Sequence, residues 1–176
     1  MFSLLQLQAI CNSKRPAIAA IYEPLVQAMA AGEIDTRQRM EMFLPQAAHE
    51  TGGFQWLSEL ASGEAYEGRK DLGNTEPGDG RKYKGHGIFQ ITGRANHAKM
   101  SKVIFGTERT LLDNPERLCE PEYAARSAVE FWNWKGLSAL ADKGDFEGVT
   151  RRINGGLNGI VDRRALLARA KLALSL

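Results

Sequence analysis

Apolar side chains recur at every third or fourth position along most of the chain, which is the spacing of one face of a helix. The helices predicted from this spacing cover residues 3–11, 16–32, 35–52, 96–104, 121–136, 145–153 and 162–176. Pro16 and Pro121 suit first helical turns, because proline lacks the N–H that has no helical partner there. Asp35, Asp145 and Asp162 are expected to cap the helices that follow them.

The stretch from residue 63 to residue 93 departs from the helical pattern. It is rich in glycine and charge, and Glu-Pro-Gly-Asp-Gly at residues 76–80 is a strong turn signal. The short apolar run within residues 83–92 predicts β structure. We therefore predict a mainly α (α+β) fold, a helical domain with a small β-hairpin insertion.

Length and composition fit one folded domain. The chain has 176 residues, of which 43% are hydrophobic, so we expect a single domain over residues 1–176. Its N-terminal helices, residues 1–34, are expected to pack on a core of residues 35–176. The net charge of +2 is too small to indicate nucleic-acid binding. No apolar run approaches the roughly 18 residues of a membrane helix, so we expect no stable membrane insertion.

Few residues could bind a metal ion. Cys11 and Cys119 form no Cys-x-x-Cys pair, and the three histidines lack the spacing of metal ligands. We therefore expect no metal and no cofactor. The first ten residues lack a basic segment followed by a long apolar one, so we expect no signal peptide and a protein made in the cytoplasm.

Two glutamates are candidates for acid–base chemistry. Glu50 lies in the last turn of an apolar helix, before Gly52 and Gly53, where partial burial would suit a general acid. Glu59 follows nine residues later, and the glycines let the chain fold back between the two carboxyl groups. Spacing alone leaves Glu59 in competition with Glu64 and Glu67 as the second carboxylate.

Two further segments could contact a neutral, polar ligand. Residues 85–96 combine glycines with Gln90, Thr92 and Asn96, whose amides and hydroxyl could bind a sugar or hold a water molecule. Asn154, before a glycine pair, could reach a ligand or end a helix in the left-handed conformation.

The combination of these motifs resembles glycoside hydrolase family 19. The matching segments are His-Glu-Thr-Gly-Gly-Phe at residues 49–54, Gly-Asp-Gly at 78–80, Tyr-Lys-Gly-His-Gly-Ile-Phe-Gln-Ile-Thr-Gly at 83–93, and Ile-Asn-Gly-Gly at 153–156. Their order and spacing are most similar to the bacteriophage endolysins of that family, over about residues 36–172. The resemblance implies a lysozyme-like fold whose β-rich edge lines the cleft.

The resemblance also implies roles for individual residues. Glu50 matches the general acid, Glu59 the general base, and Thr92 the residue that helps hold the nucleophilic water. Substrate-binding positions are implied at His49, Tyr83, His86, Gln90, Asn96 and Asn154. The family is inverting, so its carboxyl groups should be about 6.5–9.5 Å apart. His86 replaces the family's usual arginine and could tune a carboxylate only when protonated.

These implications predict a phage or prophage endolysin that hydrolyses the β-1,4 bonds of peptidoglycan. Such an enzyme would act as a monomer, held in the host cytoplasm until a holin pore admits it to the cell wall. Arg163, Arg164, Arg169 and Lys171 could attract it to an anionic envelope. The alternatives are a chitinase, which the missing signal peptide and the unpaired cysteines disfavour, and a catalytically silent wall-binding module, which the presence of both glutamates disfavours.

Overall fold

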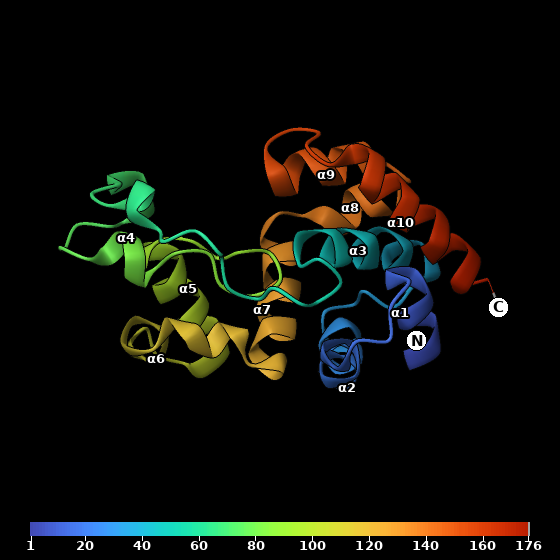
Figure 1. Ribbon diagram of the computed structural model, residues 1–176, viewed down its shortest axis with the longest axis horizontal. Coiled ribbons are helices and arrows are strands. Elements are labelled where there is room, and N and C mark those ends of the chain that lie inside the picture. The colour runs from blue at the N-terminus through green and yellow to red at the C-terminus, as the bar shows by residue number, and fades with distance from the viewer. Residues whose placement is uncertain (176) are drawn as a thin grey trace.

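The computed structural model describes residues 1–175, which are mainly helical (Figure 1). The α-helices are α1 (Leu4–Cys11), α2 (Pro16–Ala31), α3 (Arg37–Glu50), α4 (Asp79–Lys82), α5 (Arg94–Phe105), α6 (Arg109–Asp113), α7 (Pro121–Trp134), α8 (Leu137–Ala141), α9 (Phe146–Asn154) and α10 (Ile160–Ala173). Three 3₁₀ turns cover Glu64–Tyr66, Lys70–Leu72 and Pro115–Cys119. The long helices agree with the apolar spacing, whereas the short helices α4, α6 and α8 were not predicted.

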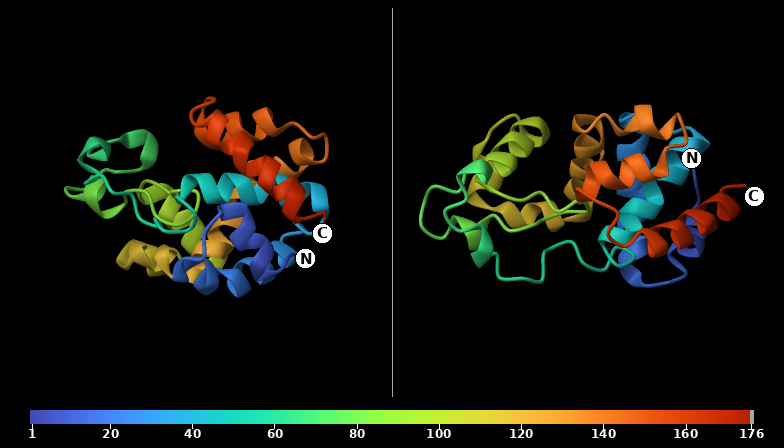
Figure 2. Two further views of the ribbon diagram at one scale, coloured as in Figure 1. Left: turned by 45° about the vertical axis from the view of Figure 1, so that its right-hand side comes forward. Right: turned by 90° about the horizontal axis from the view of Figure 1, so that it is seen from above.

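The helices form two lobes that are joined along α7 (Figures 1 and 2). In the large lobe, α10 packs on α3 and α1, and α2 packs on α7, around the main hydrophobic core. The small lobe, residues 58–120, has its own apolar cluster, which consists of Ile91, Met100, Ile104, Leu111 and Leu118. An extended segment after α3 carries the chain from the large lobe into the small one. None of the helices described is long and apolar enough to cross a membrane.

The predicted β-hairpin is wrong. In the part of the chain that the structure describes, β pairing is limited to isolated bridges of His86 with Ser58 and with Ile91. His86 and Ile91 exchange backbone hydrogen bonds of 3.1 and 2.8 Å, but the ladder ends there. Gly87 and Gln90 have φ values of 81° and 49°, and these left-handed residues turn the chain out of the strand conformation.

Two of the three predicted helix caps differ in the structure. Thr36, not Asp35, caps α3, and its Oγ1 accepts a hydrogen bond of 3.2 Å from the amide of Arg39. Asp162 does not cap α10, because that helix begins two residues earlier. Asp145 caps α9 as predicted, with a bond of 2.8 Å to the amide three residues later.

Candidate active site

Glu50 is the last residue of α3, and the turn that follows it is tightly fixed. Gly52 and Gly53 have φ values of 57° and 74°, which end the helix. The buried Thr51 hydroxyl donates to the carbonyl of Ala47 at 2.6 Å and accepts from the amide of Phe54 at 2.8 Å. The chain therefore leaves the helix directly after Glu50, whose side chain stays 22% exposed.

A buried arginine holds the Glu50 carboxylate. Arg163 of α10 is only 2% exposed, and its Nη2 donates to Oε1 of Glu50 at 2.5 Å. Its other nitrogens donate to Oε1 of Gln46 at 2.5 Å and to the carbonyl of Asn158 at 3.1 Å. Gln46 in turn donates to the Thr150 hydroxyl at 2.8 Å. The network fixes one carboxylate oxygen of Glu50 and leaves Oε2 available for proton transfer.

His49 makes a parallel contact beside this pair. Its Nδ1 lies 2.6 Å from Oδ2 of Asp162, so consecutive residues of α3 contact consecutive residues of α10. A Cβ atom on Gly159 would lie 2.4 Å from the His49 ring, so only glycine allows the ring to pack there. His49 is thus placed beside Glu50, and its role as a substrate contact stays a prediction.

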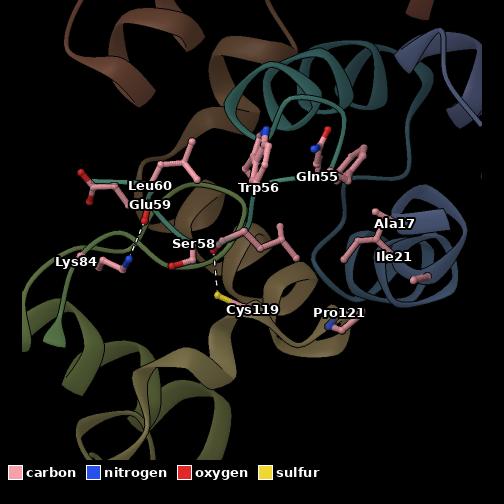
Figure 3. A pocket seen from close by; sticks show the side chains of 13 residues that line it. Ala17, Ile21, Gln55, Trp56, Ser58, Glu59, Leu60, Lys84, Cys119 and Pro121 are labelled. Carbon is pink, nitrogen blue, oxygen red and sulfur yellow. Dashed lines mark hydrogen bonds between the residues drawn. The ribbon is translucent and has the colours of Figure 1, made fainter. Parts of the chain in front are cut away.

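Glu59 is held by the small lobe. Its Oε1 accepts from the hydroxyl of Tyr66 at 2.9 Å, and its Oε2 accepts from the amide of Gly85 at 2.9 Å. Its backbone is fixed as well, because the carbonyl accepts from Nζ of Lys84 at 2.8 Å (Figure 3). Because both carboxylate oxygens accept hydrogen bonds, the orientation of the Glu59 side chain is fixed, as a general base requires.

Tyr66 was not identified from the sequence, yet it is the side chain that orients Glu59. Burial raises the pKa of Tyr66, and the hydrogen bond to Glu59 raises it further. The phenol therefore keeps its proton and acts as a donor to the carboxylate at neutral pH. No local pattern distinguishes this tyrosine from the others in the chain.

The two competing carboxylates are engaged elsewhere in the small lobe. Glu64 is paired with Arg81. Glu67 accepts from the amides of Gly78 and Gly80, at 2.7 and 2.8 Å, and so stabilises the start of α4. This arrangement favours Glu59 as the second carboxylate, although the assignment stays a prediction.

Gly85 connects Glu59 to the polar segment that follows. A Cβ atom on Gly85 would lie 2.5 Å from Oε1 of Gln90, so the glutamine side chain packs directly against the glycine whose amide binds Glu59. The carbonyl of Gln90 accepts from the Thr92 hydroxyl at 2.9 Å, and the carbonyl of Thr92 accepts from the exposed Asn96 side chain at 2.8 Å. The structure therefore brings four of the predicted site residues into one connected group.

Tyr83 and His86 are buried, which argues against direct contact with a substrate. The Tyr83 hydroxyl donates to the carbonyl of Leu112 at 2.9 Å, and Nδ1 of His86 lies 3.1 Å from Nε2 of His97. Burial lowers the pKa of His86, and it lowers the pKa of His97 to about 4. The neutral His86 therefore does not replace the charge of the family's arginine, and a role as a supporting residue is favoured.

Asn154 lies apart from these two groups, on the large lobe. It ends α9 before Gly155, which has a φ of 77°, and its amide donates to the carbonyl of Asn158 at 3.3 Å. Nε of Arg163 donates to the same carbonyl at 3.1 Å, so Asn154 and Glu50 are linked through one loop. Its contact with a substrate stays a prediction.

Of the four basic residues that the sequence predicts to attract an anionic envelope, Arg163 is buried, so the prediction is wrong for this residue. The sequence pattern does indicate this burial, because Arg163 shares the three- and four-residue spacing of the buried Leu166, Ala170 and Ala173.

Within residues 1–175 no group of three or more His, Cys, Asp or Glu side chains could hold a metal ion.

Similar proteins were found at the level of both sequence and structure, although no family model matches the chain. A glycosyl hydrolase family 19 domain-containing protein of Haemophilus influenzae is 32% identical over 185 aligned positions, which cover 88% of each chain. An endochitinase of Arabidopsis thaliana is 32% identical over 121 positions, covering 68% of this chain and 40% of the endochitinase.

Two solved structures share the fold. Chitinase C from Streptomyces griseus superposes with a TM-score of 0.79 at 21% identity, over 98% of this chain and 92% of that one. A class IV chitinase from Zea mays has a TM-score of 0.75 at 22% identity, over 99% of this chain and 92% of that one. Both alignments span the two lobes that carry Glu50 and Glu59.

Proposed function

The chain belongs to glycoside hydrolase family 19, and from this premise we propose that it is an endolysin of a phage or prophage. The family resemblance found in the motifs is confirmed, and the chain is a chitinase-like glycoside hydrolase. Beyond the family, we propose the substrate, which is the β-1,4-linked glycan strand of peptidoglycan. We also propose that the reaction inverts the configuration of the anomeric carbon.

The proposed reaction uses one carboxyl group from each lobe. Glu50 donates the proton on Oε2 to the glycosidic oxygen, and the bond from that oxygen to the anomeric carbon breaks. Glu59 accepts a proton from a water molecule, whose oxygen bonds to the anomeric carbon from the opposite face. Thr92 accepts a hydrogen bond from that water. The configuration is inverted, and one water molecule is consumed for each bond that is cleaved.

One observation carries the hydrolase proposal: the two glutamates are held differently. Among residues 1–175, a donor is found for one oxygen of Glu50, whereas both oxygens of Glu59 accept hydrogen bonds. The first arrangement leaves Oε2 of Glu50 able to face the glycosidic oxygen, and the second holds both oxygens of Glu59 in one orientation. One carboxyl group that can meet the leaving oxygen and one that is held to receive a proton from water are what the proposed reaction needs.

Two features support peptidoglycan as the substrate. The order and spacing of the motifs resemble phage endolysins, and Cys11 and Cys119 are free thiols, as expected for a protein made in a reducing compartment. Release from the host cytoplasm through a holin and action as a monomer are part of this proposal.

A chitinase is the second candidate function. It is supported by the chitinase C of Streptomyces griseus and the Zea mays chitinase, whose folds match this chain over both lobes. Chitin and peptidoglycan share the β-1,4-linked backbone, so the acid–base pair would serve either polymer.

The test compares the two polymers directly. The purified protein is added to outer-membrane-permeabilised Gram-negative cells, to isolated peptidoglycan and to soluble chitin oligomers, with Glu50→Gln as the inactive control. Loss of turbidity together with release of reducing ends from peptidoglycan is expected. Cleavage of chitin oligomers without any cleavage of peptidoglycan would establish the second candidate instead.

A further inference from the structure

A polar cavity of about 260 Å³ lies in the large lobe, next to the end of α3. The turn after α1, the Gly52 turn and one face of α10 meet there. Among its lining residues are Asn12, Arg15, His49, Asp162 and Arg169, so most of the groups that face it can form hydrogen bonds. The mechanism proposed above uses none of its charged groups.

The cavity has an excess of positive charge. Arg15 and Arg169 are both exposed, and neither has a carboxylate partner among residues 1–175. Asp162 is the one acidic residue in the lining, and its Oδ2 is already in contact with His49 at 2.6 Å. Cys11, which also lines the cavity, adds no charge, because burial raises the pKa of its thiol to about 11.

The two arginines come from elements that are fixed relative to the catalytic helix. Nη1 of Arg15 donates to the carbonyl of Gly52 at 3.4 Å, which ties the turn after α1 to the turn after Glu50. Arg169 follows Asp162 by seven residues, two turns along the same face of α10. The cavity is thus a preformed recess between packed helices.

The cavity is close to Glu50, and this distance limits which part of a bound substrate can enter the cavity. His49 and Gly52 lie within two residues of Glu50, and two residues span at most about 7 Å between Cα atoms. An extended peptide of four residues spans about 13–14 Å. Arg15 contacts the carbonyl of Gly52, and Arg169 lines the same cavity. A peptide of this length, attached to a sugar that lies beside Glu50, is therefore long enough to enter the cavity.

We propose that the cavity lined by Arg15 and Arg169 binds the carboxylates of the peptide stem that a peptidoglycan strand carries. This rests on the proposed function, because chitin has neither a peptide nor a carboxylate. Guanidinium groups suit the task, since their paired N–H donors match the two oxygens of a carboxylate. The cavity would then add affinity for peptide-bearing strands over bare glycan.

The first experiment uses three substrates: peptide-bearing glycan strands, strands whose peptides an amidase has removed, and strands whose peptide carboxylates are amidated. The double variant Arg15→Gln/Arg169→Gln is compared with wild type and with Lys102→Gln/Arg109→Gln, which removes two exposed positive charges from the small lobe. Values of KM and kcat are measured at low and high salt, and circular dichroism checks that each variant is folded.

We expect the ratio of KM on peptide-bearing strands to KM on peptide-free strands to rise about three- to tenfold in the cavity variant, as for two exposed ion pairs. The small-lobe variant should keep the wild-type ratio. The difference should shrink at high salt, because screening weakens exposed charge pairs. An unchanged ratio in the cavity variant overturns the inference.

A second measurement needs no variant in the cavity. Wild type should have a higher KM for amidated strands than for native ones. Equal KM values on native, amidated and peptide-free strands would overturn the inference while leaving the proposed function intact. Failure of wild type to cleave any of the three strands, together with cleavage of chitin oligomers, would overturn both.

Discussion

Nη2 of Arg163 lies 2.5 Å from Oε1 of Glu50, although the two residues are 113 positions apart in the chain. The neighbouring pair, His49 and Asp162, is in contact at 2.6 Å. The last turn of α3 is therefore fixed to the first turn of α10 by two adjacent side-chain contacts, one part-buried and one exposed. This double contact sets the position of the predicted acid.

The buried arginine should be important for stability as well as activity. Arg163→Met leaves Glu50 and the buried Gln46 without their donor, so we expect the free energy of unfolding to fall by about 2–4 kcal/mol. Arg164→Met is the matched control, because that arginine is exposed and its pair with Glu147 should contribute at most about 1 kcal/mol. Urea unfolding of both variants measures the difference, and equal losses would contradict the prediction.

The two glutamates should both be needed for catalysis. Glu50→Gln and Glu59→Gln should each lower kcat by about 10²–10⁴-fold, because the amide neither donates the required proton nor accepts one. Glu64→Gln should stay within about twofold of wild type, since that carboxylate is exposed and paired with Arg81. Release of reducing ends from glycan strands gives the rates. Retained activity in Glu59→Gln with a loss in Glu67→Gln would move the base to Glu67.

The buried histidine pair should make stability depend on pH. Burial lowers the pKa of His97 from 6.5 to about 4, so between these values the unfolded chain binds a proton that the folded chain does not. Stability should therefore fall by about 3 kcal/mol as the pH drops from about 6.5 to about 4, and His86 should add to the loss. Urea unfolding measured between these two pH values tests this dependence of stability on pH. In His97→Gln the slope should be shallower, and an unchanged slope would assign the effect to other groups.

The glycine that faces His49 should affect both stability and activity. In Gly159→Ala the new methyl group would lie 2.4 Å from the His49 ring at a φ of +71°, so we expect about 2 kcal/mol of destabilisation and a lower kcat. Gly106→Ala is the control, because its φ of +73° is similar and nothing lies within 4 Å of the new atom. The free energy of unfolding of Gly106→Ala should fall by only about 1 kcal/mol, and its kcat should not change. Equal behaviour of the two variants would show that the His49 contact is not important.

Local features of the sequence determined most of the helical structure and the location of the acid. The apolar spacing predicted the long helices, and the glycines after Glu50 predicted the helix end, because both depend on residues within a few positions of each other. The β-hairpin was predicted from local apolar content and was wrong. The left-handed Gln90, a residue type that rarely adopts this conformation, limits the pairing to single bridges.

The sequence by itself therefore determined the family, the order of the long helices and the candidate carboxylates. Only the tertiary structure decided which donors hold those carboxylates. Arg163 and Tyr66 act across a helix interface and across a loop, where distance in space is unrelated to spacing along the chain. The burial of His86 also depends on the tertiary structure, because the elements that pack around a side chain remove it from water.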